Sequence, residues 1–352
     1  MITSAPRTFG VLADGREVTE YTLQNQFGII VKILDYGGII RVLEVPDRLG
    51  RPADIVLGFD ELSGYEGAHP YFGAIVGRVA GRIRGGRLTI DGNRYPLSLN
   101  TPLNHIHGGT VGFDHKLWDA DYCAESNSLT LCLESLAGDE GYPGTLVARV
   151  TYRLTNANDL EVEYHATTDA PTAVNLTQHS YFNLSGDPSG NVLGHTLTVQ
   201  SERVLELDDS SIPTGRELDV ANTDFDFRTP KKIGREVEGS PGRFDGDGFD
   251  HYWILSGGTD DSVLNAALEI HHEESGRLLQ VATTAPGAQI YTGIDLPEKL
   301  IGKYGLLYRP QSGICIETQI HPDSPNRPEF PSILLGANET YQSTTVFSIR
   351  VF

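Results

Sequence analysis

Four short segments of this sequence contain residue types that bind metals, transfer protons or bind sugars. The first covers residues 104–109 and contains His105 and His107. Two histidines two positions apart on a strand point to the same face, a spacing that some metal sites use. No glutamate follows in the next several positions. We therefore expect no metal here, and a structural role for His105 is the alternative.

The second segment, residues 175–184, contains His179 among tyrosine and phenylalanine. A histidine in such surroundings is either a packed residue with satisfied hydrogen bonds or a group that exchanges protons near neutral pH. The segment alone does not distinguish between these two interpretations.

The third segment, residues 313–319, predicts a strand with Glu317 near its centre. Period-two alternation places Cys315, Glu317 and Gln319 on one face and the two isoleucines on the other. A desolvated carboxyl group has a raised pKa, as a general base at neutral pH requires. The alternative is a solvent-facing glutamate on an exposed sheet.

The fourth segment, residues 248–253, places Asp250 among aromatic residues. Carbohydrate sites often combine aromatic faces with carboxylates that accept hydrogen bonds from hydroxyl groups. A buried ion pair between Asp250 and an arginine is equally compatible with the sequence.

The elements that position these segments are short strands bounded by Gly, Asn, Asp and Pro. Asp-Gly and Gly-Gly steps supply the positive φ that tight hairpins need. We expect a brief helical segment at 60–65, a surface loop at 236–248 and a single domain over residues 1–352. The predicted strands are 29–34, 39–45, 87–90, 128–136, 145–155, 160–167, 193–200, 266–272, 278–284 and 343–351. So many strands without intervening helices predict an all-β, mostly antiparallel sandwich or barrel.

Composition narrows the class of partner and the compartment. The formal charge of −20 disfavours nucleic acid and anionic membrane surfaces as partners. Three cysteines, without a CxxC pair, form neither a disulfide framework nor a zinc motif. No apolar stretch is long enough for a transmembrane helix, and the N-terminal residues do not resemble a secretory signal. We expect a cytoplasmic protein.

The motifs, taken in order along nearly the whole chain, resemble the aldose 1-epimerase (galactose mutarotase) family. The motifs that carry the resemblance are DYGG at 35–38, DIVLGFD at 54–60, YFGA at 71–74, GRVAGRI at 77–83, HGG at 107–109, GFD at 112–114, Trp118, QHSYFNL at 178–184, GFDH at 248–251, PGAQIYTG at 286–293 and GICIETQ at 313–319, followed by HPD at 321–323.

The resemblance implies a large, mostly antiparallel β-sandwich whose concave face holds a free sugar, without metal or other cofactor. We expect a monomer or homodimer. It implies Glu317 as general base and His179 as general acid, with His107 beside it. It also implies that Arg82, Asp250 and Gln289 bind the sugar hydroxyls.

These residue types suit anomer exchange. A base removes the proton of the C1 hydroxyl while an acid protonates the ring oxygen O5, and the C1–O5 bond breaks to give an aldehyde. Rotation about C1–C2 and reclosure then give the other anomer. We expect a nearby carboxylate, from Glu317 or Asp250, to raise the pKa of His179 above about 6.5.

The chain departs from the family pattern at positions that concern substrate preference. Gly81 stands where family members commonly have asparagine, which predicts relaxed selectivity at one sugar hydroxyl. Ile106 stands where leucine is usual, and Ile320 with His321 replaces the usual ending of the last motif, which we expect to change one wall of the pocket.

Three alternative functions use the same residues. A non-catalytic sugar-binding protein would keep the pocket and lose the acid or the base. A glycoside hydrolase would use Glu317 and Asp250 as paired carboxylates at a defined separation. The third alternative is an epimerase relative that acts on phosphorylated sugars, disaccharides or pentoses, of which a phosphosugar enzyme would want basic residues at the rim. The only basic concentration, residues 78–87, serves equally well to brace a turn.

Overall fold

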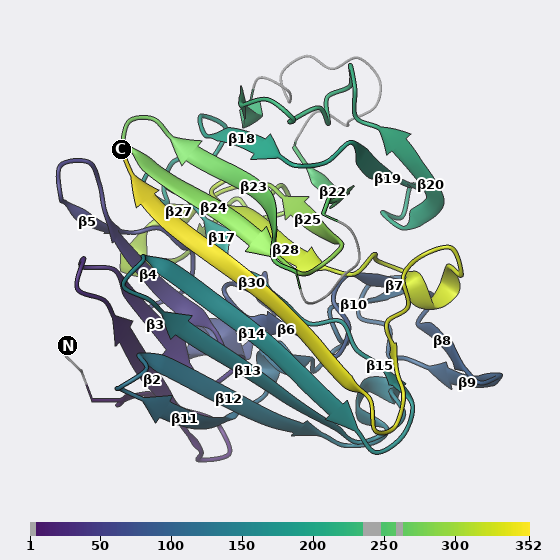
Figure 1. Cartoon of the computed structure of the whole chain (residues 1–352). Coiled ribbons are helices and arrows are strands. Elements are labelled where there is room, and N and C mark those ends of the chain that lie inside the picture. The colour runs from purple at the N-terminus through teal and green to yellow at the C-terminus, as the bar shows by residue number, and fades with distance from the viewer. Residues whose placement is uncertain (1–4, 235–247, 258–262) are drawn as a thin grey trace.

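The computed structural model describes residues 5–234, 248–257 and 263–352, which are built mainly from strands (Figure 1). The strands of the three large sheets pair antiparallel throughout. The helical elements are short: α1 (Ser63–Glu66) and the 3₁₀ turns η1 (Phe113–His115), η2 (Asp139–Gly141), η3 (Lys303–Gly305) and η4 (Ser324–Asn326). The predicted all-β antiparallel architecture is confirmed.

The largest sheet has nine strands, and Figure 1 shows several of them side by side along the diagonal of the molecule. Their spatial order is β11 (Asp119–Cys123), β12 (Ser128–Ser135), β13 (Leu146–Leu154), β14 (Asp159–Thr168), β30 (Thr340–Val351), β24 (Arg277–Thr283), β23 (Asn265–His272), β18 (Thr196–Val199) and β21 (Lys231–Lys232).

Two smaller sheets complete the main framework. The five-stranded sheet runs β1 (Arg7–Val11), β2 (Glu17–Gln24), β3 (Ile30–Leu34), β4 (Ile40–Pro46) and β5 (Pro52–Asp54). The six-stranded sheet runs β17 (Tyr181–Phe182), β28 (Ile314–Gln319), β25 (Gly287–Tyr291), β22 (Asp250–Ile254), β19 (Arg203–Leu207) and β20 (Pro213–Asp219).

Short pairs of strands close the corners. They are β7 (Arg82–Arg84) with β10 (Asn104–Ile106), β8 (Arg87–Ile90) with β9 (Asn93–Pro96), β6 (Ile75–Val76) with β16 (Thr177–Gln178), β15 (Thr172–Ala173) with β29 (Leu334–Leu335), and β26 (Leu300–Ile301) with β27 (Leu307–Tyr308).

One apolar core joins the three large sheets. Val150 and Phe347 of the nine-stranded sheet belong to the same buried cluster as Val31 of the five-stranded sheet and Ile316 of the six-stranded sheet. The hydroxyl groups of Thr318 and Thr345, 2.6 Å apart, also link β28 to β30. The inner face of β28 is therefore anchored in the core, which leaves its other face to form a site.

Most strands predicted from alternation and turn residues are present, with ends shifted by a few residues. Residues 193–200 are the clearest exception, because only β18 (Thr196–Val199) is a strand there. The helix expected at 60–65 is a single turn. The loop predicted at 236–248 lies outside the described residues except for Gly248. No helix within the described ranges is long and apolar enough to cross a membrane.

Truncation of Ile316 tests whether β28 depends on the core. Ile316 is 1% exposed, so Ile316→Ala leaves a cavity and is expected to lower the free energy of unfolding by about 2–5 kcal/mol. Ile301→Ala, at a side chain 57% exposed, is the matched control and should change it by less than about 0.5 kcal/mol. Urea denaturation measures both, and equal effects would contradict the anchoring of β28.

Candidate active site

Glu317 lies on β28, between β25 and β17, with its side chain buried. The alternation predicted for this strand is present, because Ile314 and Ile316 belong to the main core while Glu317 lines a cavity. The solvent-facing alternative is therefore wrong. Burial, with a further contribution from the nearby Asp250 carboxylate, raises the pKa of Glu317 to about 8.

His179 follows β16 and faces Glu317. Its Nε2 lies 3.5 Å from Glu317 Oε1. The backbone is held on both sides, because the His179 N–H donates to Ala74 O at 2.9 Å and its carbonyl accepts from Gly73 N at 3.0 Å. The ring stacks on Tyr181 with centroids 5.2 Å apart. The two predicted proton-transfer groups thus lie in direct proximity, with the imidazole held in place.

The prediction that the pKa of His179 is raised is wrong. A nearby carboxylate was expected to raise it, whereas burial lowers the pKa of His179 to about 4. Desolvation disfavours the imidazolium ion more than the surrounding charges favour it. Near neutral pH the pair therefore shares one proton, and in the protein without sugar that proton resides on the Glu317 carboxyl group.

His107 lies beside this pair, immediately after β10. Its Nδ1 is 4.0 Å from Glu317 Oε2 and accepts a hydrogen bond from Gly81 N at 3.3 Å. The ring meets that of His179 edge-on, with centroids 5.2 Å apart. His107 and Tyr71 both have a left-handed backbone, with φ of 52° and 59°. Such strain in bulky residues is uncommon and concentrates at functional sites.

Asp250, Arg82 and Gln289 form a second polar group on the same side of the sheet. Asp250 Oδ2 lies 3.3 Å from Arg82 Nη1, and Gln289 Nε2 donates to Asp250 Oδ1 at 2.7 Å. Gln289 is the ladder partner of both Tyr252 and Glu317, which places it between the strands of Asp250 and Glu317. Asp250 therefore does pair with an arginine, but the pair is partly accessible and not buried as the alternative interpretation had it.

A cavity of about 390 Å³ joins five of the six predicted residues, and its size is typical of a small-molecule site. Gln289 lines a small space that adjoins it, together with Arg82, His107, Asp250 and Glu317. The other residues that line the main cavity are Ala68, His69, Pro70, Tyr71, Ile106, Tyr181, Tyr291, Asp295, Leu296, Pro297 and Leu300. The tyrosines were not predicted as site residues, because tyrosines are spread along the chain without a distinguishing pattern.

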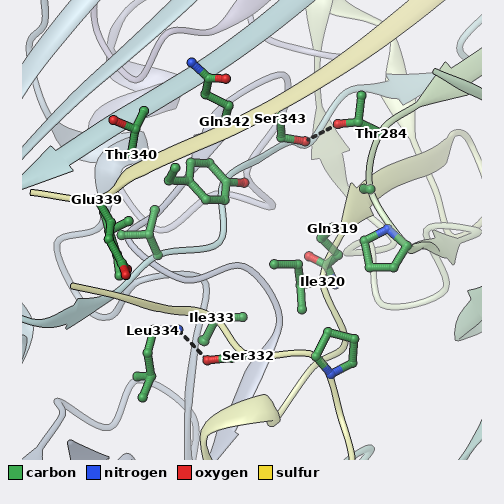
Figure 2. A pocket seen from close by; sticks show the side chains of 16 residues that line it. Thr284, Gln319, Ile320, Ser332, Ile333, Leu334, Glu339, Thr340, Gln342 and Ser343 are labelled. Atoms are coloured by element: carbon green, nitrogen blue, oxygen red, sulfur yellow. Dashed lines mark hydrogen bonds between the residues drawn. The ribbon is translucent and has the colours of Figure 1, made fainter. Parts of the chain in front are cut away.

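A larger cavity of about 540 Å³ lies between the segment before β29 and the start of β30 (Figure 2), and it shares Gln319 with the small space beside the site. Of the described residues that line it, only Glu339 carries a charge, and no histidine is among them. It therefore lacks the acid–base pair that the smaller cavity contains.

His105 has a structural role, which was the alternative to metal binding. Tyr142 Oη lies 2.6 Å from its Nε2, and its Nδ1 lies 2.7 Å from Ser98 O. Both ring nitrogens are thus engaged away from the cavity, so His105 and His107 do not form a joint site. The ligand atoms of His107, His179 and Glu317 do lie within 4.8 Å of one another, so the expectation of no metal stays a prediction.

A family model described as aldose 1-epimerase matches residues 19–348. The chain belongs to the aldose 1-epimerase family. It is 43% identical to galactose mutarotase of Homo sapiens over 344 residues, 97% of each chain. It is 34% identical to aldose 1-epimerase of Escherichia coli K12 over 339 residues, 95% of this chain and 96% of that protein.

Solved structures agree with this membership. An aldose epimerase homologue from C. elegans superposes with a TM-score of 0.87 at 31% identity, covering 94% of this chain and 98% of that one. Galactose 1-epimerase from Lactobacillus acidophilus superposes with a TM-score of 0.85 at 28% identity, covering 99% and 98%. The family's fold is therefore present over nearly the whole chain, and the family is one of isomerases.

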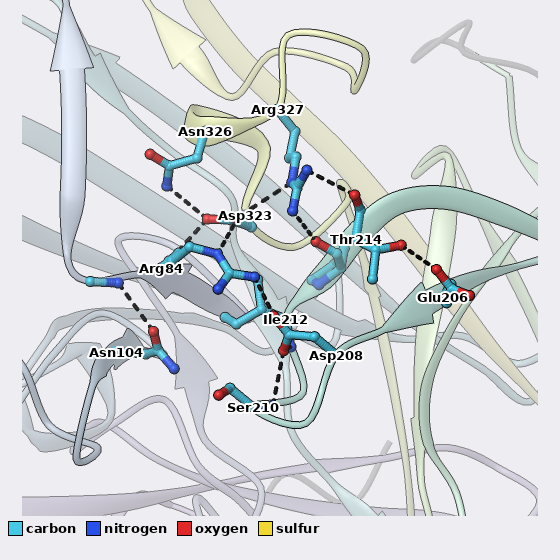
Figure 3. Close-up of polar contacts among 12 residues, drawn as sticks. Arg84, Asn104, Glu206, Asp208, Ser210, Ile212, Thr214, Asp323, Asn326 and Arg327 are labelled. Atoms are coloured by element: carbon cyan, nitrogen blue, oxygen red, sulfur yellow. Dashed lines mark hydrogen bonds and ion pairs between the residues drawn. The ribbon is translucent and has the colours of Figure 1, made fainter. Parts of the chain in front are cut away.

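A polar network around Arg84 and Asp323 (Figure 3) adjoins Arg82 of this epimerase in the chain. Asp323 N donates to the Arg82 carbonyl at 2.8 Å, and Asp323 Oδ1 accepts from Arg84 N at 2.9 Å. The Arg84 side chain pairs with Asp208 at 2.5 Å. Arg84 thus braces the strand, while Arg82 is the one arginine among the described residues that line the main cavity.

The departures from the family pattern have unequal consequences. A Cβ atom on Gly81 would lie 3.2–3.3 Å from Pro322 and from Gln319 Nε2, so position 81 borders the small space beside the site. His321 packs against Tyr252 and Phe330, with ring centroids 4.8 and 4.9 Å away, and does not line the 390 Å³ cavity. The expectation that His321 alters the pocket wall is therefore wrong.

The raised pKa of Glu317 predicts a pH-dependent stability difference. Its folded-state pKa, about 8, exceeds its usual value of 4.5, so the wild type loses stability as pH rises between them. Glu317→Gln has no such loss. The free energy of unfolding of Glu317→Gln minus that of the wild type should therefore rise by about 2–4 kcal/mol from pH 5 to pH 8.5. Urea denaturation at both values checks this, and a constant difference would contradict a protonated Glu317.

Proposed function

We propose that this aldose 1-epimerase interconverts the α and β anomers of free aldoses such as glucose and galactose, with Glu317 and His179 exchanging protons with the hemiacetal. The supporting observation is the 3.5 Å contact between the two groups inside a cavity of suitable size. O1 and O5 of a cyclic sugar are bonded to one carbon, so two neighbouring groups can each reach one of them.

The reaction needs one proton in total on Glu317 and His179. Glu317 as carboxylate takes the proton of the C1 hydroxyl while His179 Nε2 gives its proton to O5, and the C1–O5 bond breaks to leave an aldehyde. The products of this step are a protonated Glu317 and a neutral His179. Burial raises the pKa of Glu317 and lowers that of His179, so it favours a protonated Glu317 and a neutral His179. The pair is therefore in its favoured protonation state when the open-chain sugar is bound.

The reverse step regenerates the ring. After rotation about C1–C2, Glu317 returns its proton to the carbonyl oxygen while O5 attacks C1 and gives its proton to His179. The ring-closed sugar then faces a carboxylate and an imidazolium ion. Hydroxyl groups of the bound sugar stabilise that ionic form by donating to the carboxylate in a site from which water is displaced.

The remaining residues orient a neutral, hydroxyl-rich ring. Asp250 accepts hydrogen bonds from hydroxyl groups, and Arg82 donates them from its partly exposed guanidinium group. Gln289 restrains Asp250 through their 2.7 Å hydrogen bond. Tyr181 and Tyr291 contribute apolar surface to the cavity. Such positioning matters because a small displacement of the ring from the proton-transfer groups slows the reaction strongly.

Several expectations stay predictions. The family acts on sugars, so a small-molecule sugar is the partner, and we expect a monomer or homodimer in the cytoplasm that needs no cofactor. We also expect all of residues 1–352 to form one domain.

Polarimetry tests the two proton-transfer roles. Fresh α-glucose or α-galactose should lose its excess rotation rapidly with the wild type. Glu317→Gln and His179→Gln, which preserve side-chain size or polarity, should each reduce kcat by at least about 10²-fold, because each removes one of the two proton-transfer groups.

Matched controls come from the same residue types elsewhere. Glu339→Gln alters a carboxylate of the other cavity, and His271→Gln alters a half-buried histidine of β23, so both should keep the wild-type rate. A full rate in Glu317→Gln or His179→Gln would remove that residue from its role. Retained sugar binding without any wild-type catalysis would favour the sugar-binding alternative.

Gly81→Asn tests substrate preference. Gly81 has φ of 75°, a conformation that asparagine tolerates better than most residues, and its new side chain would enter the space beside Arg82. One added hydrogen bond to a sugar hydroxyl changes kcat/KM by about 2–10-fold for the sugars that present it. We expect altered kcat/KM ratios among galactose, glucose and xylose. Unchanged ratios would reject a role for position 81 in selectivity.

A further inference from the structure

Gln319 is a buried polar residue beside the reacting pair, and the proposed proton transfers give it no role. It lies on β28 two positions after Glu317, so the alternation of the strand directs both side chains to the same face. Like Glu317, Arg82 and Gln289, it lines the small space that adjoins the 390 Å³ cavity. This space of about 20 Å³ has room for one water molecule or one hydroxyl group.

The amide group of Gln319 lacks hydrogen-bond partners. The residue is 2% exposed, yet neither its Oε1 nor its Nε2 has a partner among the described residues. A primary amide offers two donors and one acceptor, and burial without partners costs free energy because the lost hydration is not replaced. The folded protein therefore carries an unfavourable contact at this position that a suitable ligand would relieve.

The two other glutamines that are buried in the described structure show the usual situation. Gln178, which is also 2% exposed, donates from Nε2 to Gly73 O and accepts from Ser180 N, both at 2.7 Å. Gln289 donates to the carboxylate of the ion pair at 2.7 Å. Because native proteins pair nearly all buried polar groups, the unpaired amide of Gln319 beside an open space indicates a partner that enters that space.

The protein fixes the backbone of Gln319 and provides no side chain to bind its amide. The Tyr252 hydroxyl donates to Gln319 O at 2.8 Å, and ladder pairing with Gly287 sets the register. A Cβ atom on Gly81 would lie 3.3 Å from Gln319 Nε2, so the absence of a side chain at position 81 leaves room beside the amide. The terminal torsion of glutamine is broad, so the amide can turn toward this room at little cost.

Gln319 also lines the larger cavity of about 540 Å³, where Figure 2 labels it. The position of Gly81 distinguishes the two spaces. Gly81 lines the small space but is not among the described residues that line the larger cavity, and Gln319 Nε2 lies close to it. The donor end of the amide is therefore on the side of the reacting pair.

We propose that the Gln319 amide binds one hydroxyl group of the sugar, which enters the small space beside Glu317, and that Gln319 thereby contributes to substrate selectivity. A hydroxyl group both donates and accepts hydrogen bonds, as the amide does, and the space admits one such group. A site built to bind a hydroxyl group discriminates against sugars that lack it, because its buried polar group then stays unpaired. The inference rests on the proposed function, since it concerns which sugars that reaction accepts.

Rates of anomer exchange with deoxy sugars, followed by polarimetry, test the proposal. Gln319→Met keeps an unbranched side chain and removes both polar groups, so kcat/KM for glucose should fall by about 2–10-fold. Both proteins are then compared on glucose analogues that lack the hydroxyl group at C2, C3, C4 or C6. For one analogue the wild type and Gln319→Met should have equal kcat/KM, because the missing hydroxyl group and the missing amide are the two sides of one hydrogen bond.

Thermal stability separates sugar binding from a structural role. Gln319→Met removes an unpaired buried amide, so its melting temperature should not lie below that of the wild type. Gln178→Met removes an amide with both atoms bonded, so its melting temperature should fall by at least about 2 °C. Gln342→Met, at an exposed glutamine that lines only the larger of the two spaces, should change neither stability nor kcat/KM.

Three results would overturn the proposal. They are a wild-type kcat/KM of Gln319→Met on glucose, an equal loss on glucose and on every analogue, and a lowered melting temperature of Gln319→Met. In each case the wild type still exchanges anomers, so the proposed function would stand while this role of Gln319 would not. A wild type that does not accelerate anomer exchange would instead refute the proposed function, and this inference with it.

Discussion

The proposed chemistry of this protein depends on a carboxyl group and an imidazole that are buried against each other with one proton between them. In water both Glu317 and His179 would change charge on the acidic side of neutrality. Burial moves the two pKa values apart, to about 8 and about 4, so that the pair keeps one proton over the intervening range. Each step of the proposed reaction removes one proton from the sugar and adds one to it, so the pair must hold one proton throughout. The desolvation that separates the two pKa values also destabilises the ionised carboxyl group.

The rest of the fold holds this pair against that cost. β28 is anchored by Ile316 on its core face, and the backbone of His179 is held between Gly73 and Ala74. Close backbone approaches are needed as well. A Cβ atom on Gly108 would lie 1.7 Å from Gly77 O, so the turn that places His107 beside Glu317 requires glycine. The site is precise because distant segments of chain constrain it, and none of those segments could form it alone.

Much of this could be predicted from the sequence, because alternation and turn residues report local geometry. The face of β28 that carries Glu317 follows from period two, and the order of the motifs brought the six site residues together. The direction in which the pKa of His179 shifts could not be predicted. It depends on whether burial of the ring outweighs the attraction of nearby charges, and the sequence shows neither. Gly81 and Gln319 are far apart in the sequence, and no local pattern relates them.

Two histidine–carboxylate clusters show why residue type alone does not assign a role. One consists of His107, His179 and Glu317, and the other of His69, Asp114 and His115. In both, a buried carboxylate faces two imidazole rings. At Glu317 one of those rings, His107, has its inward nitrogen occupied by a backbone N–H, which leaves a single imidazole free to exchange a proton. At Asp114 the Nδ1 of His115 lies 2.5 Å from the carboxylate, and this hydrogen-bonded ion pair raises the pKa of His115. Clusters of the same residue types thus differ: burial lowers the pKa of the imidazole that is proposed to exchange protons, whereas a direct ion pair raises the pKa of the other.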